Sequence, residues 1–284
     1  MQLKKLSALL IISYCCFVGA STAAWAVSEK QEVEIGKQGA ARAVQKYGIV
    51  KDKSMLLRAK KLGKRLAANA QRKNIKYQFS VLNCKEVNAM AFPGGYIFFT
   101  KGIIKLMDDE LLAFVAGHEI SHVEHRDSVK AIESAQRRMV GIALLQRFVK
   151  GADSDLSRSI MGMTNAVVSN RYSQSAEFAA DKNGIFLMAA AGYNPYKSVD
   201  ALKALQKLGG KDMPGFLNSF LSTHPITTDR IERAEAIAPE AADMYPDSIP
   251  ETSENGDEAG IEEANSMEPQ VQQSEDVNRQ NSDF

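Results

Sequence analysis

Two histidines four positions apart, with a glutamate directly after the first, are the first residues in this 284-residue sequence whose types and spacing could do chemistry. The segment from His118 to His122 is His-Glu-Ile-Ser-His. On an α-helix, positions i and i+4 share one face, so both imidazoles can bind one metal ion. Glu119 lies beside them and can take a proton from a metal-bound water and pass it to a leaving amine. The alternative is an exposed, charged helix end, because residues 124–127 are Glu, His, Arg and Asp.

A catalytic zinc site needs a third protein ligand and an open position for water. The chain has four histidines, and His125 follows the pair on the same predicted helix. His125 is a poor third ligand, because one helix cannot readily place three ligands around one ion. A second element must contribute, and the best candidate is Glu177 in the helical stretch 173–181. Asp181 follows one turn later and can accept the other ring N–H of a ligand histidine. Without the histidine pair, both acids would be interpreted as a solvated helix face.

The elements that must position these side chains follow from hydrophobic periodicity and from turn residues. We predict a helix that starts after Asp108, continues past His125 and reaches about Val149. The other expected elements are a helix at 27–70, a strand at 76–83, a bend or short strand at 88–93, a strand at 96–100, and helices at 156–191, 195–208 and 228–238. Gly192 is expected to end the helix before it. The predicted fold class is α+β, mostly helical, with a small β-sheet.

The first 26 residues have the pattern of a signal peptide. Lys4 and Lys5 precede an apolar run at 6–19, and Ala24-Trp25-Ala26 offers a cleavage site, so the mature chain is expected to begin at Val27. The alternative is an uncut membrane anchor. After removal Cys84 is the only cysteine, which excludes an intramolecular disulfide. No later apolar stretch approaches the length of a membrane span, so the mature protein is expected to be soluble.

The charge is distributed unevenly along the chain, although its formal net value is only +1. Residues 240–284 hold 13 acidic side chains against one basic residue, a net charge of −12. Such a segment cannot bury enough apolar surface to offset its ordering entropy, so we predict a disordered acidic tail at 240–284 after a domain at 27–239. The basic residues of that domain are scattered without interleaved aromatics, which argues against nucleic-acid binding but leaves contact with the anionic envelope periphery open.

Three further stretches carry a family resemblance. They are Asn88 to Ile97 (Asn-Ala-Met-Ala-Phe-Pro-Gly-Gly-Tyr-Ile), Glu177-Phe-Ala-Ala-Asp181, and Thr223-His224-Pro225 with Arg230 after it. With the histidine pair, residues 30–238 resemble the HtpX/BepA-like (CaaX-prenyl-protease-type) family of zinc metallopeptidases, and its soluble periplasmic members in particular. The resemblance implies a gluzincin-type fold and one Zn²⁺ per subunit. Residue by residue, it implies the ligands His118, His122 and Glu177, the general base Glu119 and the supporting acid Asp181.

The resemblance also implies a function, namely hydrolysis of peptide bonds in misfolded or misassembled envelope proteins after export to the periplasm. Residues 88–100 resemble a substrate-binding edge at which extended peptides pair with a strand. His224 is expected to stabilise the oxyanion or to occupy the open metal position as a gate. Arg230 is expected to support this loop or to bind a carboxylate such as Asp181 or Glu177. The alternatives are a zinc-containing chaperone or adaptor with little turnover, and a structural zinc protein with a closed fourth ligand.

Overall fold

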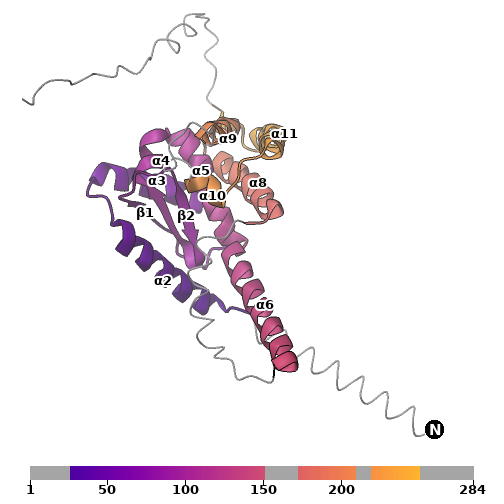
Figure 1. The fold of residues 1–284 in the computed structure, drawn as a ribbon. Coiled ribbons are helices and arrows are strands. Elements are labelled where there is room, and N and C mark those ends of the chain that lie inside the picture. Colours follow the sequence, from indigo (N-terminus) through magenta and orange to yellow (C-terminus); the bar gives the residue numbers. More distant parts are fainter. Residues whose placement is uncertain (1–25, 151–171, 209–218, 250–284) are drawn as a thin grey trace, which may run out of the picture. The chain divides into compact units, whose positions relative to one another are not determined.

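A three-stranded sheet forms the β part of the structure, a computed structural model that describes residues 26–150, 172–208 and 219–249 (Figure 1). The strands are β1 (Gln78–Leu82), β2 (Ala89–Phe92) and β3 (Tyr96–Thr100), in the order β1-β3-β2. β3 is parallel to β1 and antiparallel to β2. The β2–β3 turn is the 3-10 segment η1 (Pro93–Gly95), in which both glycines have positive φ. The predicted mostly helical α+β fold with a small sheet is thus confirmed.

Side-chain alternation along the strands gives the sheet two buried faces. Ile97 and Phe99 of β3 face the main core, which the sheet shares with α3 (Lys53–Ala67) and α5 (Asp109–Glu124). Phe98 points to the other face, where the sheet packs against α2 (Glu29–Tyr47). Figure 1 shows the sheet between these helices, with α2 on one side and α3 and α5 on the other. Burial on both faces fixes the register of the strands.

The central helix is α5, which is buried along most of its length between the sheet and α8 (Gln174–Ala190). The two helices approach each other most closely where Gly117 meets Gly184. A Cβ added to Gly184 would lie 2.9 Å from the backbone nitrogen of His118. The other described helical elements are α4 (Lys101–Leu106), α6 (Asp127–Lys150), α9 (Lys197–Leu208), α10 (Ser219–Thr223), α11 (Thr228–Met244) and η3 (Pro246–Ser248).

The helix predicted at 27–70 is wrong as a single element, because the chain forms α2 and α3 with a connection between them. Gly48 ends α2 in a positive-φ conformation, and Ile49 pairs with Leu82 as an isolated β-bridge. Asp52 then caps α3 by accepting the backbone N–H groups of Ser54 and Met55. The local turn and cap therefore outweigh the high helix propensity of the segment.

The predicted continuation of the histidine helix past His125 is also wrong. α5 ends at Glu124, Arg126 has a φ of 56°, and α6 starts anew at Asp127. Similarly, the helix predicted at 156–191 begins only at Gln174 in the described residues, with Ser173 as its N-cap; residues 156–171 lie outside them. Gly192 follows α8 with a φ of 74°, as the sequence predicts.

The last helix of the domain is longer than predicted. The sequence ended it at 238, but α11 continues to Met244 with Pro239 inside it, and Ala241 and Ala242 are buried. The domain boundary at 239 stays a prediction. The predicted signal peptide, apart from Ala26, and the tail from residue 250 onward lie outside the described residues. Among the helices of the described segments, none combines the length and apolarity needed to cross a membrane.

Candidate metal centre

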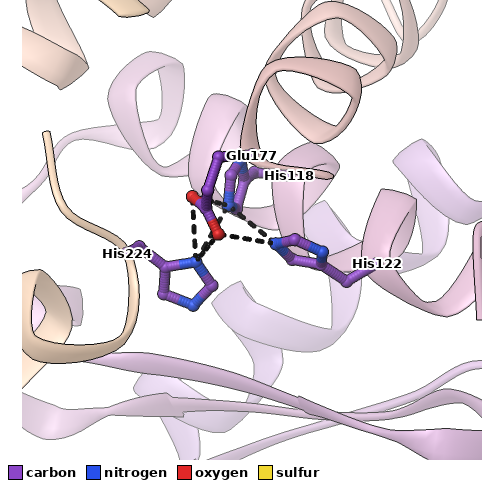
Figure 2. Close-up of side chains that lie close together, drawn as sticks. All are labelled: His118, His122, Glu177 and His224. Carbon is purple, nitrogen blue, oxygen red and sulfur yellow. Dashed lines mark hydrogen bonds and ion pairs between the residues drawn. The ribbon is translucent and has the colours of Figure 1, made fainter. Parts of the chain in front are cut away.

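Four buried side chains from three parts of the chain converge on one point (Figure 2). α5 contributes His118 and His122, α8 contributes Glu177, and the loop after α10 contributes His224. One potential ligand atom from each lies within 4.8 Å of the others. The Nε2 atoms of the two α5 histidines are 3.1 Å apart, and each lies 3.5 Å from an oxygen of Glu177. The predicted meeting of the two imidazoles with the distant glutamate is present.

The outer nitrogen of each α5 histidine contacts a carboxylate. His118 Nδ1 lies 2.9 Å from Asp181, the acid one turn after Glu177 on α8. His122 Nδ1 lies 2.9 Å from Asp127, the first residue of α6. An Nδ1–H that donates to a carboxylate leaves Nε2 free to bind a cation and fixes the orientation of the ring. Both rings therefore present the same nitrogen to the common point.

Asp127 was missed as a partner of the site, because the helix of His118 and His122 was predicted to continue past His125. On a continuous helix Asp127 would be rotated about 140° from His122. The left-handed backbone of Arg126 ends α5 and brings Asp127 back to the imidazole. The only sequence signal for this contact is an aspartate five positions after His122. Its role can be recognised only when the break between α5 and α6 is known.

Arg230, on α11, links the two acids of α8. Its Nη1 donates to Glu177 at 2.7 Å, while Nη2 and Nε donate to the two oxygens of Asp181 at 2.6 Å each. The sequence predicted that Arg230 binds Asp181 or Glu177, and it binds both. Only 1% of Arg230 is exposed, so the guanidinium acts as a fixed buried charge. Burial alone would raise the pKa of Asp181, but its bonds to His118 and Arg230 lower it and keep the carboxylate ionised.

The electrostatics of the cluster favour a bound cation. Burial by itself lowers the pKa of His118, but the carboxylates of Asp181 and Glu177 raise it to about 9. The buried acids therefore favour a positive charge at His118. A divalent cation would supply that charge instead.

His224 is the fourth member of the cluster. Its Nδ1 lies 3.0 Å from Glu177 and 3.2 Å from His118 Nε2, and its Nε2 lies 3.5 Å from Glu119. The ring stacks on Phe220 with centroids 4.7 Å apart. Burial lowers the pKa of His224 and favours the neutral imidazole, which is the form that binds metals.

A pocket opens beside the cluster and holds about 450 Å³ of empty space, part of it open to solvent. Its walls come from β2, η1, α5, α6 and the loops on either side, and they comprise residues 89–93, Glu119, Ser128, Tyr172, Thr223 and His224. Glu119 is buried, and its Oε1 accepts no hydrogen bond within the part of the chain that the structure describes. The carboxylate thus keeps one oxygen available at the inner end of the pocket.

Tyr172 is a second residue that sequence reasoning missed. Its ring stacks on His122 with centroids 4.0 Å apart and 20° between the planes, and its hydroxyl lies 2.8 Å from the hydroxyl of Ser128. The sequence placed Tyr172 inside a long helix, where nothing distinguished it from other partly buried aromatics. It precedes Ser173, the N-cap of α8, and so lies just outside that helix.

A family model for Peptidase family M48 matches residues 57–238, more than half of the chain. The chain belongs to this family. The predicted resemblance is therefore confirmed, and the buried His/Glu cluster of this M48 chain fits a metal ion both by its donor types and by its carboxylate-bound imidazoles.

Relatives of this M48 chain include the beta-barrel assembly-enhancing protease of Yersinia pestis, 31% identical over 185 residues, which are 61% of this chain and 37% of that protein. The mitochondrial metalloendopeptidase OMA1 of Arabidopsis thaliana is 31% identical over 167 residues, 58% of this chain and 32% of that one. Metalloprotease YcaL of Escherichia coli is 28% identical over 181 residues, 62% of this chain and 69% of that one. The matched region is thus about two fifths of the length of the first relative.

Proposed function

We propose that this M48 chain is a zinc-dependent endopeptidase that hydrolyses peptide bonds in extended protein segments. The observation that carries the proposal is the buried cluster of His118, His122 and Glu177, with a buried Glu119 beside it whose Oε1 accepts no hydrogen bond from the described residues. Two imidazoles and one carboxylate form a donor set suited to a catalytic Zn²⁺, which keeps a further position open for water or substrate. One ion per subunit accounts for all three ligands.

Zinc, when bound, supplies a Lewis acid that makes a water molecule easier to deprotonate and polarises the scissile carbonyl. We infer that Glu119 accepts the proton of the attacking water and then donates it to the leaving amine. The inference is supported by Oε1, which accepts no hydrogen bond from the residues that the structure describes. Asp181 and Asp127 hold the tautomers of His118 and His122 through contacts of 2.9 Å.

The substrate is proposed to bind along β2. Among the described residues, β2 pairs with β3 on one side only and is the last strand of the sheet, and residues 89–93 line the pocket that contains Glu119. An extended peptide can add to such an edge through backbone hydrogen bonds, with little preference for sequence. Unfolded or misassembled chains expose such segments, whereas folded ones do not.

The cellular setting is part of the same proposal. A leader at residues 1–26 would direct the chain out of the cytoplasm. Relatives carry the name beta-barrel assembly-enhancing protease, and we infer from it that misfolded or misassembled envelope proteins in the periplasm are the substrates. The acidic segment at the end of the chain has no assigned role in this scheme.

His224 is proposed to act as a gate, because its Nδ1 lies among the potential ligand atoms of the other three residues. In this position it competes with water or substrate for the open position of the ion. The alternative role is stabilisation of the oxyanion. Replacement by alanine separates the two, since loss of a gate raises peptidase activity whereas loss of an oxyanion donor lowers it.

The decisive experiment compares wild type with Glu119→Gln on an unfolded casein-like protein. The amide cannot act as the base, so cleavage should fall by about 10²- to 10⁴-fold while the metal content is unchanged. Glu235→Gln, an exposed change on α11, is the matched control and should cleave like wild type. Client binding without cleavage by wild type would instead favour the chaperone or adaptor function.

A further inference from the structure

The backbone nitrogen of Val27 makes a contact that the proposed peptidase chemistry does not use. It donates to Oε1 of Glu133 at 2.9 Å, across 106 positions of sequence. The side chain of Val27 is buried, whereas Ala26 before it is exposed. Val27 is also the residue that directly follows the Ala24-Trp25-Ala26 pattern. The atom that meets the carboxylate is therefore the one that would become the chain's amino terminus if the leader were removed at that pattern.

We propose that Glu133 is the binding site for the protein's own α-ammonium group, formed when a leader peptidase hydrolyses the bond between Ala26 and Val27. Water is added across the bond: the hydroxyl goes to the carbonyl of Ala26, and the nitrogen of Val27 becomes an amine that is protonated near neutral pH. The contact with the Glu133 carboxylate, until then between a neutral amide and an anion, then becomes an ion pair between two opposite charges.

The charges around Val27 determine whether such an ion pair is favourable. Arg126 donates to the carbonyl of Val27 at 2.5 Å, but its own charge is balanced by Glu32 at 2.8 Å. Lys130, one turn before Glu133 on α6, contacts Asp127 at 3.4 Å. The positive end of the α2 dipole opposes a cation at Val27, and the acids Glu29 and Glu32 in its first turn counter it. Glu133 is therefore the carboxylate that pairs directly with the new ammonium group of Val27.

The ion pair would lie against the joint that builds one side of the metal centre. Arg126, which binds the carbonyl of Val27, is the left-handed residue between α5 and α6. Asp127 follows it and contacts His122, while Glu133 lies further along the same helix α6. Removal of the leader would therefore fasten α6 to the first residues of the mature chain and help to hold Asp127 in place.

The test begins with the full chain, expressed with its leader in an exporting bacterial host. Mass spectrometry of the purified protein should find Val27 as the first residue. The pKa of its α-amino group, measured by competitive acetylation over a pH series, should lie above the ordinary value of about 7.7–8.0. Glu133→Gln keeps a hydrogen-bond acceptor but loses the charge, so the α-amino pKa should return to the ordinary range. Glu34→Gln, an exposed change on α2, should leave the pKa raised.

A stability series supplies the second measurement. A raised folded-state pKa gives stability that is present below about pH 8, the unfolded value, and is lost as pH rises through the folded value. Each unit of pKa shift corresponds to about a tenfold change in the folding equilibrium. The Tm advantage of wild type over Glu133→Gln should therefore be largest near pH 7 and should narrow above pH 9. A mature chain that starts elsewhere, or equal α-amino pKa values in wild type and Glu133→Gln, would overturn the proposal.

Discussion

The contact between Gly117 and Gly184 sets how closely α8 can approach α5, and a single methyl group tests its importance. A Cβ on Gly184 would lie 2.9 Å from the backbone nitrogen of His118 and 3.1 Å from the carbonyl carbon of Gly117. Both atoms belong to the backbone of α5, so no flexible side chain can move aside. Ordinary contacts are about 3.4–4 Å, and the helices must therefore separate by roughly 0.5 Å in Gly184→Ala.

Two opposing effects decide the stability of Gly184→Ala. Overpacking costs about 1–3 kcal/mol, whereas alanine in place of glycine within a helix returns about 0.5–1 kcal/mol. The net loss of about 1 kcal/mol should lower Tm by about 2–4 °C. Activity should suffer more, because Glu177 and Asp181 lie on the same face of α8 as Gly184 and would move away from His118 together. A displacement of this size should reduce cleavage by about tenfold or more.

The assay measures Tm, zinc affinity and cleavage of unfolded casein for three variants. Gly117→Ala should be the most damaging, because its Cβ would lie only 2.7 Å from the carbonyl oxygen of Gly184. Gly184→Ala should be intermediate, and Ser175→Ala, an exposed change on the same helix, should resemble wild type. If Gly184→Ala kept full zinc affinity and activity, the glycine contact would not set the position of Glu177, and this reasoning would be wrong.

Three other predictions concern the surroundings of the site. Asp127→Asn should weaken zinc binding by about 10–100-fold in a chelator competition, since His122 loses the partner that fixes its ring; unchanged affinity would remove Asp127 from the site. Burial alone raises the pKa of Glu32, but Arg72 and Arg126 lower it in the folded protein. The ionised Glu32 therefore stabilises the fold above about pH 4.3, the ordinary pKa of glutamate, and this stabilisation is lost as the pH falls through the pKa of Glu32 in the folded protein. Glu32→Gln should therefore have a lower Tm than wild type at pH 7, a gap that narrows in acid; a constant gap would contradict the ion-pair explanation. Removal of the metal with a chelator should lower Tm by about 10 °C, and zinc alone should restore it, because the ion binds only the folded state.

The sequence alone was sufficient to predict those pairs of site residues that lie on one face of a single helix. The spacing of His118 and His122 predicts a shared face, and Asp181 lies one turn after Glu177 for the same reason. The meeting of the two helices was predicted from the need for a third ligand, and the family resemblance supported it, because periodicity does not say which faces pack together. The sequence analysis did not single out Gly117 and Gly184, where the two helices approach each other most closely.

Other features were missed because they depend on breaks in helices. The left-handed Arg126 has no strong sequence signal, since nonglycine residues seldom adopt this conformation, and without it Asp127 cannot be placed next to His122. Tyr172 was assigned to a helix interior, whereas it precedes the N-cap of α8 and stacks on His122. The end of the last helix was also misplaced, because α11 continues through Pro239 to Met244, beyond the predicted 238. In each case tertiary contacts outweighed a local preference.

The most direct test of the metal centre is anomalous diffraction at the zinc absorption edge from crystals of the purified mature protein. The proposal predicts one zinc ion per chain, bound by Nε2 of His118, Nε2 of His122 and a carboxylate oxygen of Glu177, with metal–nitrogen distances of about 2.0–2.1 Å. An anomalous peak elsewhere in the molecule, or a zinc ion that Glu177 does not touch, would contradict it.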